Sequence, residues 1–382
     1  MGKRLYTDKA LFLAIVVMVT FGLVMVYSAS SIIAVQGKYK VEPHHFFGHQ
    51  LLWAGASFLV MMGMKRLDYR RFNTPAWAFG GVGVVLMLLM AAFVMDGAKH
   101  RWLNLGVGRL QPSELAKPAL VVFVAFFLTR RIRAVNNMRF TLGGCGLVLG
   151  TLALAVSVAD LGTAVVLVAA TAVTFFVAGL DWKYLVKATP VAMLLLLAGI
   201  AAKPYRVGRM IVMLDPEHKI LKQIDPNGWI LTYVRSSGAP PDAAWQGLQA
   251  KIALGSGGWF GLGLMDGKQK LFYLPEPHTD FIYAVIGEEL GLLGTAAVLV
   301  GFFVVLWRGY RTFLVAPDDF GRYLALGVTT MIVWQALFNL TVVTGLGPTK
   351  GIPLPMISYG GSSLLATLFL VGLLLSVSER SN

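Results

Sequence analysis

Long apolar runs alternate with short polar or glycine-rich connections along most of the chain. A transmembrane helix needs about 20 predominantly apolar residues, and backbone that faces lipid must be hydrogen-bonded within its own segment. About ten runs meet this length, centred near residues 22, 56, 86, 121, 150, 170, 194, 292, 333 and 368. The pattern predicts an all-α integral membrane protein in which residues 1–382 form a single polytopic domain.

One long segment, at about residues 203–278, interrupts the series between the seventh and eighth runs. Its aromatic residues include Trp229, Tyr233, Trp245 and Trp259. Aromatic side chains at this density favour the membrane interface. Residues 205–216 have the pattern of an interfacial amphipathic helix. The segment is therefore expected to be a long extracytoplasmic loop that lies on the membrane surface.

Lysine and arginine gather in alternate connections, which predicts the orientation of the chain. The clusters are Lys3, Arg4 and Lys9, then residues 65–71, 129–139, 181–187 and 307–311, and finally Arg322 and Arg380. All of them fall on one side of the predicted spans. Short basic connections mark the cytoplasmic side, so both termini are expected in the cytoplasm.

Composition supports the membrane assignment and narrows the chemistry. The chain is 57% hydrophobic and 14% charged, whereas soluble domains are about 45–50% apolar and about 25% charged. The net charge of +14 favours anionic lipid headgroups or an anionic substrate over nucleic acid in a membrane protein. The one cysteine, Cys145, allows no disulfide within the chain. The 6 histidines form no HExxH pattern, so no zinc site is expected.

Residues 271–291 place charged groups at the edge of an apolar run, where burying an ionised carboxylate costs several kcal/mol. Thr279 is expected to cap the eighth helix, with Asp280 in its first turn, where the helix dipole favours a negative charge. Asp280 is then either an interfacial helix-start acid or a carboxylate that acts as a base or cation ligand.

Glu288 and Glu289 follow about two turns deeper in the same helix. Glu288 would lie about 80° round the helix from Asp280, close enough to share a cavity, and Glu289 would point nearly the opposite way. The alternative is that both glutamates form hydrogen bonds between packed helices.

A second polar group lies at residues 109–117, where Pro112 fits the first turn of a helix. Glu114 and Lys117 share a face of this helix, because they are three residues apart. They form either a structural ion pair or a unit in which Glu114 holds Lys117 against an anionic ligand. Asp160 stands alone between two apolar runs, a position typical of a turn.

Basic residues are also abundant on the predicted extracytoplasmic side: Arg101, Arg109, Arg206, Arg209, Lys251, Lys268, Lys270 and Lys350. The positive-inside rule does not predict so many there. A ligand that carries a pyrophosphate would explain them through charge-assisted hydrogen bonds. The glycine-rich residues 255–263 are more typical of a flexible turn than of a phosphate loop.

Several segments, in order and from about residue 10 to 378, resemble the SEDS family (shape, elongation, division and sporulation), typified by RodA and FtsW. They are "RWLNLG", "QPSELAK", "DLGT", "YRVGRMIVMLDP", "KIALGSGGWFGLGL", "LPEPHTDFIYAVIGEELGLLG" and "GIPLPMISYGGSSLL". The resemblance implies a peptidoglycan glycosyltransferase of the bacterial cytoplasmic (inner) membrane whose substrate is lipid II, a disaccharide-pentapeptide on undecaprenyl pyrophosphate. Asp280 takes the place of the family's catalytic carboxylate, and Glu114, Lys117 and Asp160 match its other polar motif positions.

This resemblance also implies a mechanism. Asp280 would be the general base, and Arg101, Arg206, Arg209 and Lys270 would bind the substrate with Glu114, Lys117 and Asp160. A divalent cation, magnesium or manganese, is an optional cofactor, and no organic cofactor is expected. The rival functions are a lipid II flippase and a scaffold for division partners.

The resemblance implies a class B penicillin-binding protein as the crosslinking partner, and the chain itself lacks the SxxK, SxN and KTG motifs of a transpeptidase. Gly287, Gly291 and Gly294 would let the partner's helix approach, unless they pack against helices of this chain. Two features depart from the family pattern: Val158-Ala159 in place of Gln-Pro, and residues 225–244, which match nothing. Residues 348–351, "PTKG", favour the FtsW branch.

Overall fold

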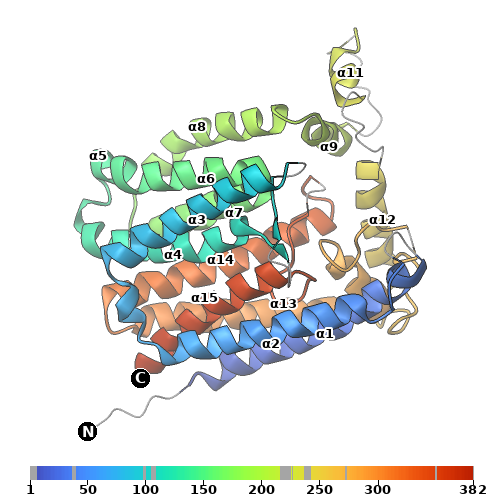
Figure 1. The fold of residues 1–382 in the computed structure, drawn as a ribbon, viewed down its shortest axis with the longest axis horizontal. Coiled ribbons are helices and arrows are strands. Elements are labelled where there is room, and N and C mark those ends of the chain that lie inside the picture. The colour runs from blue at the N-terminus through green and yellow to red at the C-terminus, as the bar shows by residue number, and fades with distance from the viewer. Residues whose placement is uncertain are drawn as a thin grey trace.

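The computed structural model describes residues 7–36, 40–97, 100–104, 109–215, 225, 227–235, 242–271, 273–348 and 351–381, and this part of the chain is helical nearly throughout (Figure 1). The main helices are α1 (Lys9–Gln36), α2 (His45–Arg66), α3 (Pro75–Met95), α4 (Pro112–Arg131), α6 (Leu147–Ala159), α7 (Leu161–Val177), α8 (Trp182–Ala201), α9 (Pro204–Leu214), α11 (Trp229–Arg235), α12 (Asp242–Ser256), α13 (Ile282–Val315), α14 (Asp319–Val343) and α15 (Gly361–Arg380). Shorter elements are η1 (Tyr69–Phe72), η2 (Ile132–Ala134), α5 (Met138–Phe140), η3 (Thr141–Gly146), and the antiparallel strands β1 (Leu103–Asn104) and β2 (Arg109–Leu110).

Each predicted apolar centre lies within one of these helical segments. Among the described residues, eight segments are long and apolar enough to cross a membrane: Lys9–Val35, His45–Arg66, Pro75–Met95, Thr141–Ala159, Trp182–Ala201, Ile282–Val315, Asp319–Val343 and Gly361–Arg380. The other two centres lie on α4 and on α7, which is apolar but spans only 17 residues. The prediction of an all-α, multi-pass membrane protein is therefore confirmed.

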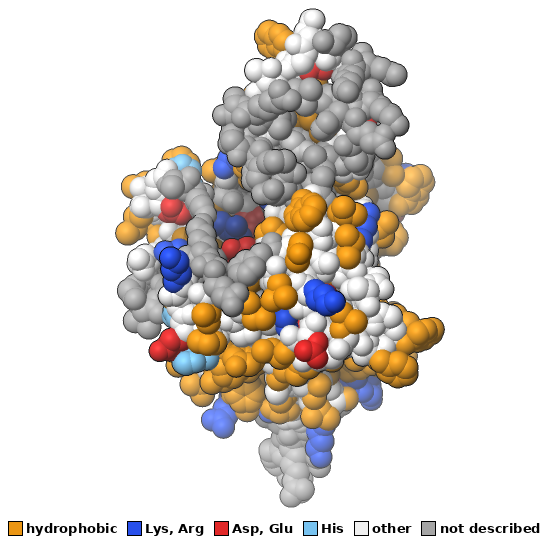
Figure 2. Space-filling model, turned by 90° about the vertical axis from the view of Figure 1, so that its right-hand side faces the viewer, with side chains coloured by type: hydrophobic (Ala, Val, Ile, Leu, Met, Phe, Trp, Pro, Cys, Tyr) orange, Lys and Arg blue, Asp and Glu red, His pale blue; other side chains and the backbone are white. Residues whose placement is uncertain are grey.

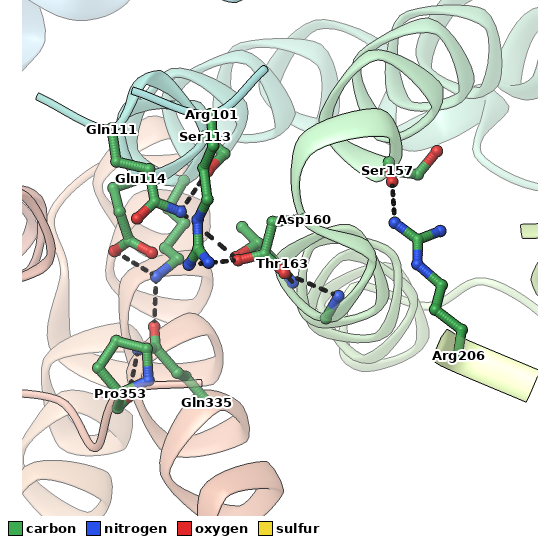
Figure 3. Close-up of polar contacts among 12 residues, drawn as sticks. Arg101, Gln111, Ser113, Glu114, Ser157, Asp160, Thr163, Arg206, Gln335 and Pro353 are labelled. Carbon is green, nitrogen blue, oxygen red and sulfur yellow. Dashed lines mark hydrogen bonds and ion pairs between the residues drawn. The ribbon is translucent and has the colours of Figure 1, made fainter. Parts of the chain in front are cut away.

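Local sequence explains where the helices next to the polar groups begin. Pro112 opens α4, where its missing N–H is not needed. The Asp160 carboxylate caps α7 by accepting the backbone N–H groups of Gly162 and Thr163 at 3.0 and 3.3 Å. These two helix starts bring Glu114 and Asp160 into the same group of polar side chains (Figure 3).

Burial differs strongly among the spans. In α15, 83% of the apolar window is buried inside the protein, and α15 packs mainly against α2. In α8 the buried share is 0%, and this helix lies at the edge of the bundle, next to α9 (Figure 1). The core is therefore centred on α14 and α15, whereas α8 presents its apolar side chains to the surroundings.

The two ends of the described chain lie at the same end of the bundle (Figure 1). The Thr7 hydroxyl donates to the Glu379 carboxylate at 2.5 Å, and Lys65 lies 3.1 Å from the same carboxylate. Nearby, Arg308 forms an ion pair with Asp8 at 2.7 Å. This agrees with the expected pairing of the termini on one side, and which side of the membrane that is stays a prediction.

The opposite end carries the segment between α8 and α13. It contains α9, which forms the expected amphipathic piece, together with α11 and α12 (Figure 1). Within residues 225–244, which match no family motif, residues 226 and 236–241 lie outside the described part, as do Thr349 and Lys350.

Candidate active site

Asp280 lies just before α13 and not within its first turn. The helix begins at Ile282 after Phe281, and no side chain caps it. The expected cap by Thr279 is wrong, because the Thr279 hydroxyl donates to the Glu276 carbonyl at 3.0 Å. The position of Asp280 is therefore set by a turn and by its neighbours, and not by the geometry of a helix.

The Asp280 carboxylate is partly buried and makes no hydrogen bond or salt bridge with any described residue. It lies against the backbone at Gly351, where a Cβ atom would overlap the carboxyl group. Burial raises the pKa of Asp280 to about 6, and the positive charges of Arg101 and Arg209 limit this rise. The group is therefore an acid without a partner in the described part of the chain, and it is mostly ionised at neutral pH.

Arg101 and Asp160 form a second contact near this acid. The Arg101 Nη2 atom lies 3.3 Å from the Asp160 Oδ2 atom, which also accepts the Thr163 hydroxyl at 3.1 Å (Figure 3). Asp160 is 3% exposed, whereas the Arg101 side chain is 34% exposed. The guanidinium can therefore reach a ligand while Asp160 orients it.

Glu114 and Lys117 form the ion pair that their spacing predicts. Their charged atoms are 2.7 Å apart, and both side chains are only 2% exposed. The Lys117 ammonium also donates to the Gln335 carbonyl oxygen at 2.7 Å. Figure 3 shows Glu114 and Gln335 reaching toward the region that Arg101 and Asp160 occupy.

The three other predicted basic residues have different surroundings. Arg209 lies near Asp280, and burial lowers its pKa although the Asp280 charge opposes this shift. Arg206 donates to the Gly199 and Ser157 carbonyls at 2.7 and 3.0 Å and lies apart from Asp160 in Figure 3. Lys270 is buried and ion-paired with Glu289 at 2.6 Å. The structure thus brings Arg101 and Arg209 to Asp280, but not Arg206 or Lys270.

The expected cavity shared by Glu288 and Asp280 is wrong. The Glu288 carboxylate accepts the backbone N–H groups of Lys268 and Gln269 at 2.7 and 3.1 Å. The predicted angle between Asp280 and Glu288 was wrong because Asp280 lies before the helix and not within it. Both glutamates instead form hydrogen bonds between packed segments, which was the alternative interpretation.

Sequence analysis missed two amides on α14, Gln335 and Asn339. They are buried and four residues apart, so they share one face of the helix. The signal was available, because two amides at helical spacing in an apolar run are costly unless they have partners.

Figure 2 views the molecule from this end and shows a recess with acidic and basic side chains inside it. Within the described residues, no three His, Cys, Asp or Glu side chains gather in a way that could hold a metal ion. The magnesium or manganese ion that the family resemblance allows stays a prediction.

These features define a polytopic helical membrane protein with a partly buried acid and arginines at one end of its bundle. The chain belongs to the FtsW/RodA/SpoVE family of cell cycle proteins, whose model matches residues 8–382.

The chain is similar to the probable peptidoglycan glycosyltransferase FtsW of Trichlorobacter lovleyi, with 38% identity over 97% of this chain and 93% of the relative. It is also similar to the stage V sporulation protein E of Bacillus subtilis, with 36% identity over 99% of both chains. Among solved structures, a chain from a study of a peptidoglycan synthase complex that coordinates polymerization and crosslinking has a TM-score of 0.70, 25% identity and 99% coverage of both chains. Thermus thermophilus RodA has the same fold, with a TM-score of 0.62, 24% identity and coverage of 99% of this chain and 98% of that one.

Proposed function

We propose that this protein polymerises peptidoglycan glycan strands from lipid II, with Asp280 as the general base. Its relatives identify it as a peptidoglycan glycosyltransferase. The observation that carries the finer proposal is the Asp280 carboxylate, which has no partner among the described residues and lies near two arginines.

In the proposed reaction, the 4-hydroxyl of the incoming lipid II sugar attacks the anomeric carbon of the growing strand. A new carbon–oxygen bond forms, the bond to the strand's pyrophosphate breaks, and Asp280 takes the hydroxyl proton. A base with a pKa of about 6 is mostly ionised at neutral pH and is matched to this task. The pyrophosphate leaves as a stable anion, so no general acid is required.

Arg101 and Arg209 stabilise the charge that develops on the departing pyrophosphate in this proposal. Both lie close enough to Asp280 for their charges to lower its pKa. Donors that are already positioned where charge develops stabilise the transition state without a cost for reorganisation. Glu114, Lys117 and Asp160 form the adjoining wall and orient the bound headgroup, while Arg206 and Lys270 hold neighbouring segments in place.

We further propose an inner-membrane location with cytoplasmic termini and a class B penicillin-binding protein as partner. A structure from the study of a peptidoglycan synthase complex supports such an assembly. Gly287 and Gly291 do not offer it a surface, because Cβ atoms there would overlap Leu254 and Gly261 of this chain. A Cβ atom at Gly294 would meet only Leu290 and Ile286 of its own helix, so the proposed contact with the partner's helix rests on Gly294.

The test is polymerisation of purified lipid II by the purified protein in nanodiscs, beside Asp280→Asn. We expect the variant to fold and to lose polymer formation by at least about 100-fold, since general-base catalysis contributes about 10²–10⁴. Asp181→Asn, an exposed acid that precedes α8, is the matched control and should retain activity. Near-normal polymerisation by Asp280→Asn would rule out the base, and lipid II transfer across the bilayer without polymer would favour the flippase.

A further inference from the structure

The turn that carries Asp280 is held in place by hydrogen bonds to three consecutive backbone carbonyls. The carbonyl of residue 278 accepts the Tyr359 N–H at 2.9 Å, and that of residue 279 accepts the Ser358 hydroxyl at 2.5 Å. The carbonyl of Asp280 itself accepts the Asn339 side-chain amide at 2.8 Å. Two of these donors come from the loop before α15, and the third is a side chain of α14.

Asn339 joins two segments that are far apart in the sequence. Its Nδ2 atom donates to the Asp280 carbonyl and to the Ile352 carbonyl at 2.8 and 2.7 Å, so both amide hydrogens are used. Its Oδ1 atom is buried and has no hydrogen-bond partner among the residues that the structure describes. Turning the amide over would bring that oxygen against two carbonyl oxygens, so the donor orientation is fixed. The contribution of Asn339 is therefore the two hydrogen bonds that its side-chain N–H groups donate.

Gln335, one turn earlier, makes the matching connection to the Glu114–Lys117 pair. It accepts the Lys117 ammonium at 2.7 Å and donates to the Pro353 carbonyl at 2.7 Å. The two amides of α14 thus contact the neighbouring carbonyls of residues 352 and 353. Through Gln335 and Asn339, one face of α14 contacts the Glu114–Lys117 pair, the loop before α15 and the backbone of Asp280.

We infer that Asn339 is a positioning residue for the polymerisation reaction, because its side-chain amide fixes the backbone of Asp280 relative to Ile352 in the loop before α15. This inference rests on the proposed role of Asp280. Gly351 lies directly against the Asp280 carboxyl, so a shift of either backbone moves the acid relative to its surroundings.

The amide donors of Asn339 are directed at backbone carbonyls and not at the substrate. Removing them should therefore change the orientation of the base more than the binding of lipid II. A misplacement of about 1 Å can cost about 100-fold in rate. The expected signature is a lower kcat with little change in KM.

Asn339→Asp is the sharpest variant, because it keeps the shape of the side chain and replaces the donating nitrogen by oxygen. We expect kcat for lipid II polymerisation, per folded molecule in nanodiscs, to fall at least about 30-fold, with KM changed less than about 3-fold. The acid limb of the pH–rate profile should also move by at least about half a unit, because the charges facing Asp280 change. Asn339→Ala introduces no charge and should give the same loss of kcat without that charge-driven movement of the acid limb.

The matched control is Thr329→Val on the same helix. The Thr329 hydroxyl is buried but donates only to the Ala325 carbonyl of its own helix at 2.7 Å. Its loss should leave kcat and the pH profile unchanged. This separates positioning from a general effect of removing a buried polar group from α14.

Two sets of outcomes would overturn the inference. Normal kcat and an unmoved acid limb in both Asn339 variants would show that the amide does not position the base. Failure of both variants to fold, or a loss explained by the folded fraction alone, would assign Asn339 to folding. Activity in Asp280→Asn would instead defeat the proposed function, whereas an inactive Asp280→Asn beside normal Asn339 variants would defeat this inference alone.

Discussion

Two buried ion pairs of almost the same geometry lie in different settings. Glu114–Lys117, the site pair, has its charged atoms 2.7 Å apart, and Lys270–Glu289, the loop pair, has them 2.6 Å apart. No side chain of either pair is more than 2% exposed. The site pair has a glutamine as its further partner, whereas the loop pair has the Ser28 hydroxyl. Distance and burial alone therefore do not distinguish a pair beside a reaction site from a purely structural one.

The loop pair lies close to the point where helix α13 is interrupted. Gly291 has φ 64° and ψ −157°, which interrupts α13. The carbonyls of Glu288 and Glu289 then accept the N–H groups of Leu262 and Gly263 at 2.9 and 3.0 Å. Unsatisfied backbone groups at membrane depth would cost several kcal/mol each. The glycine-rich loop thus replaces the missing helical turn, and the loop pair fastens it.

The site pair has no such role in the backbone. It joins α4 to α14 through Gln335 and lies beside Arg101 and Asp160 (Figure 3). We therefore expect the loop pair to control folding and the site pair to control activity more than folding.

Breaking the loop pair should have the largest effect on stability. Lys270→Met leaves the Glu289 carboxylate buried without its cation, and we expect a loss of about 3–5 kcal/mol. The measurement is thermal unfolding in detergent. The double variant Lys270→Met/Glu289→Gln removes both charges and should recover at least about 1 kcal/mol.

The matched control for this experiment is Lys268→Met, since Lys268 is exposed and only two residues away. Its melting temperature should stay close to that of the unaltered protein. Equal losses in Lys268→Met and Lys270→Met would show that the ion pair contributes nothing specific.

Breaking the site pair should have a smaller effect on stability, about 1–3 kcal/mol, because charged hydrogen bonds are worth about this much and the pair does not hold an interrupted helix in place. Activity per folded molecule should fall at least about tenfold in Lys117→Met. A double-mutant cycle with Glu114→Gln should show coupling of at least about 0.5 kcal/mol.

Arg131→Met, at the exposed end of the same helix, is the control for the site pair. It should leave polymerisation unchanged. Additive effects of Glu114→Gln and Lys117→Met would contradict a functional pair, despite their contact.

Sequence patterns predicted what depends on local spacing. The three-residue spacing of Glu114 and Lys117 predicts their contact, and apolar runs predict the helices. Sequence patterns could not predict that Lys270 lies beside Glu289. These residues are 19 apart, and they meet because the loop before α13 packs against the helix where it is interrupted at Gly291. The predicted angle between Asp280 and Glu288 was also wrong, because it assumed a continuous helix where the chain forms a turn at Asp280.

The smallest expected effect is the response to pH, which should separate activity from folding without a mutation. Burial raises the pKa of Asp280 to about 6, so the active, ionised form is lost as the pH falls through that value. The rate should therefore be nearly constant above pH 7 and fall about tenfold by pH 5, because one pH unit below the pKa leaves about a tenth of the base ionised. Lipid II polymerisation across this range, with the melting temperature measured at each pH, tests the expectation. A carboxyl whose pKa is higher in the folded protein than in the unfolded chain makes the folded state more stable as the pH falls. Asp280 therefore gives no reason for unfolding at pH 5. A rate that fell only together with the melting temperature would assign the pH dependence to folding, and an acid limb near pH 4 would mean that Asp280 is more solvated than its burial implies.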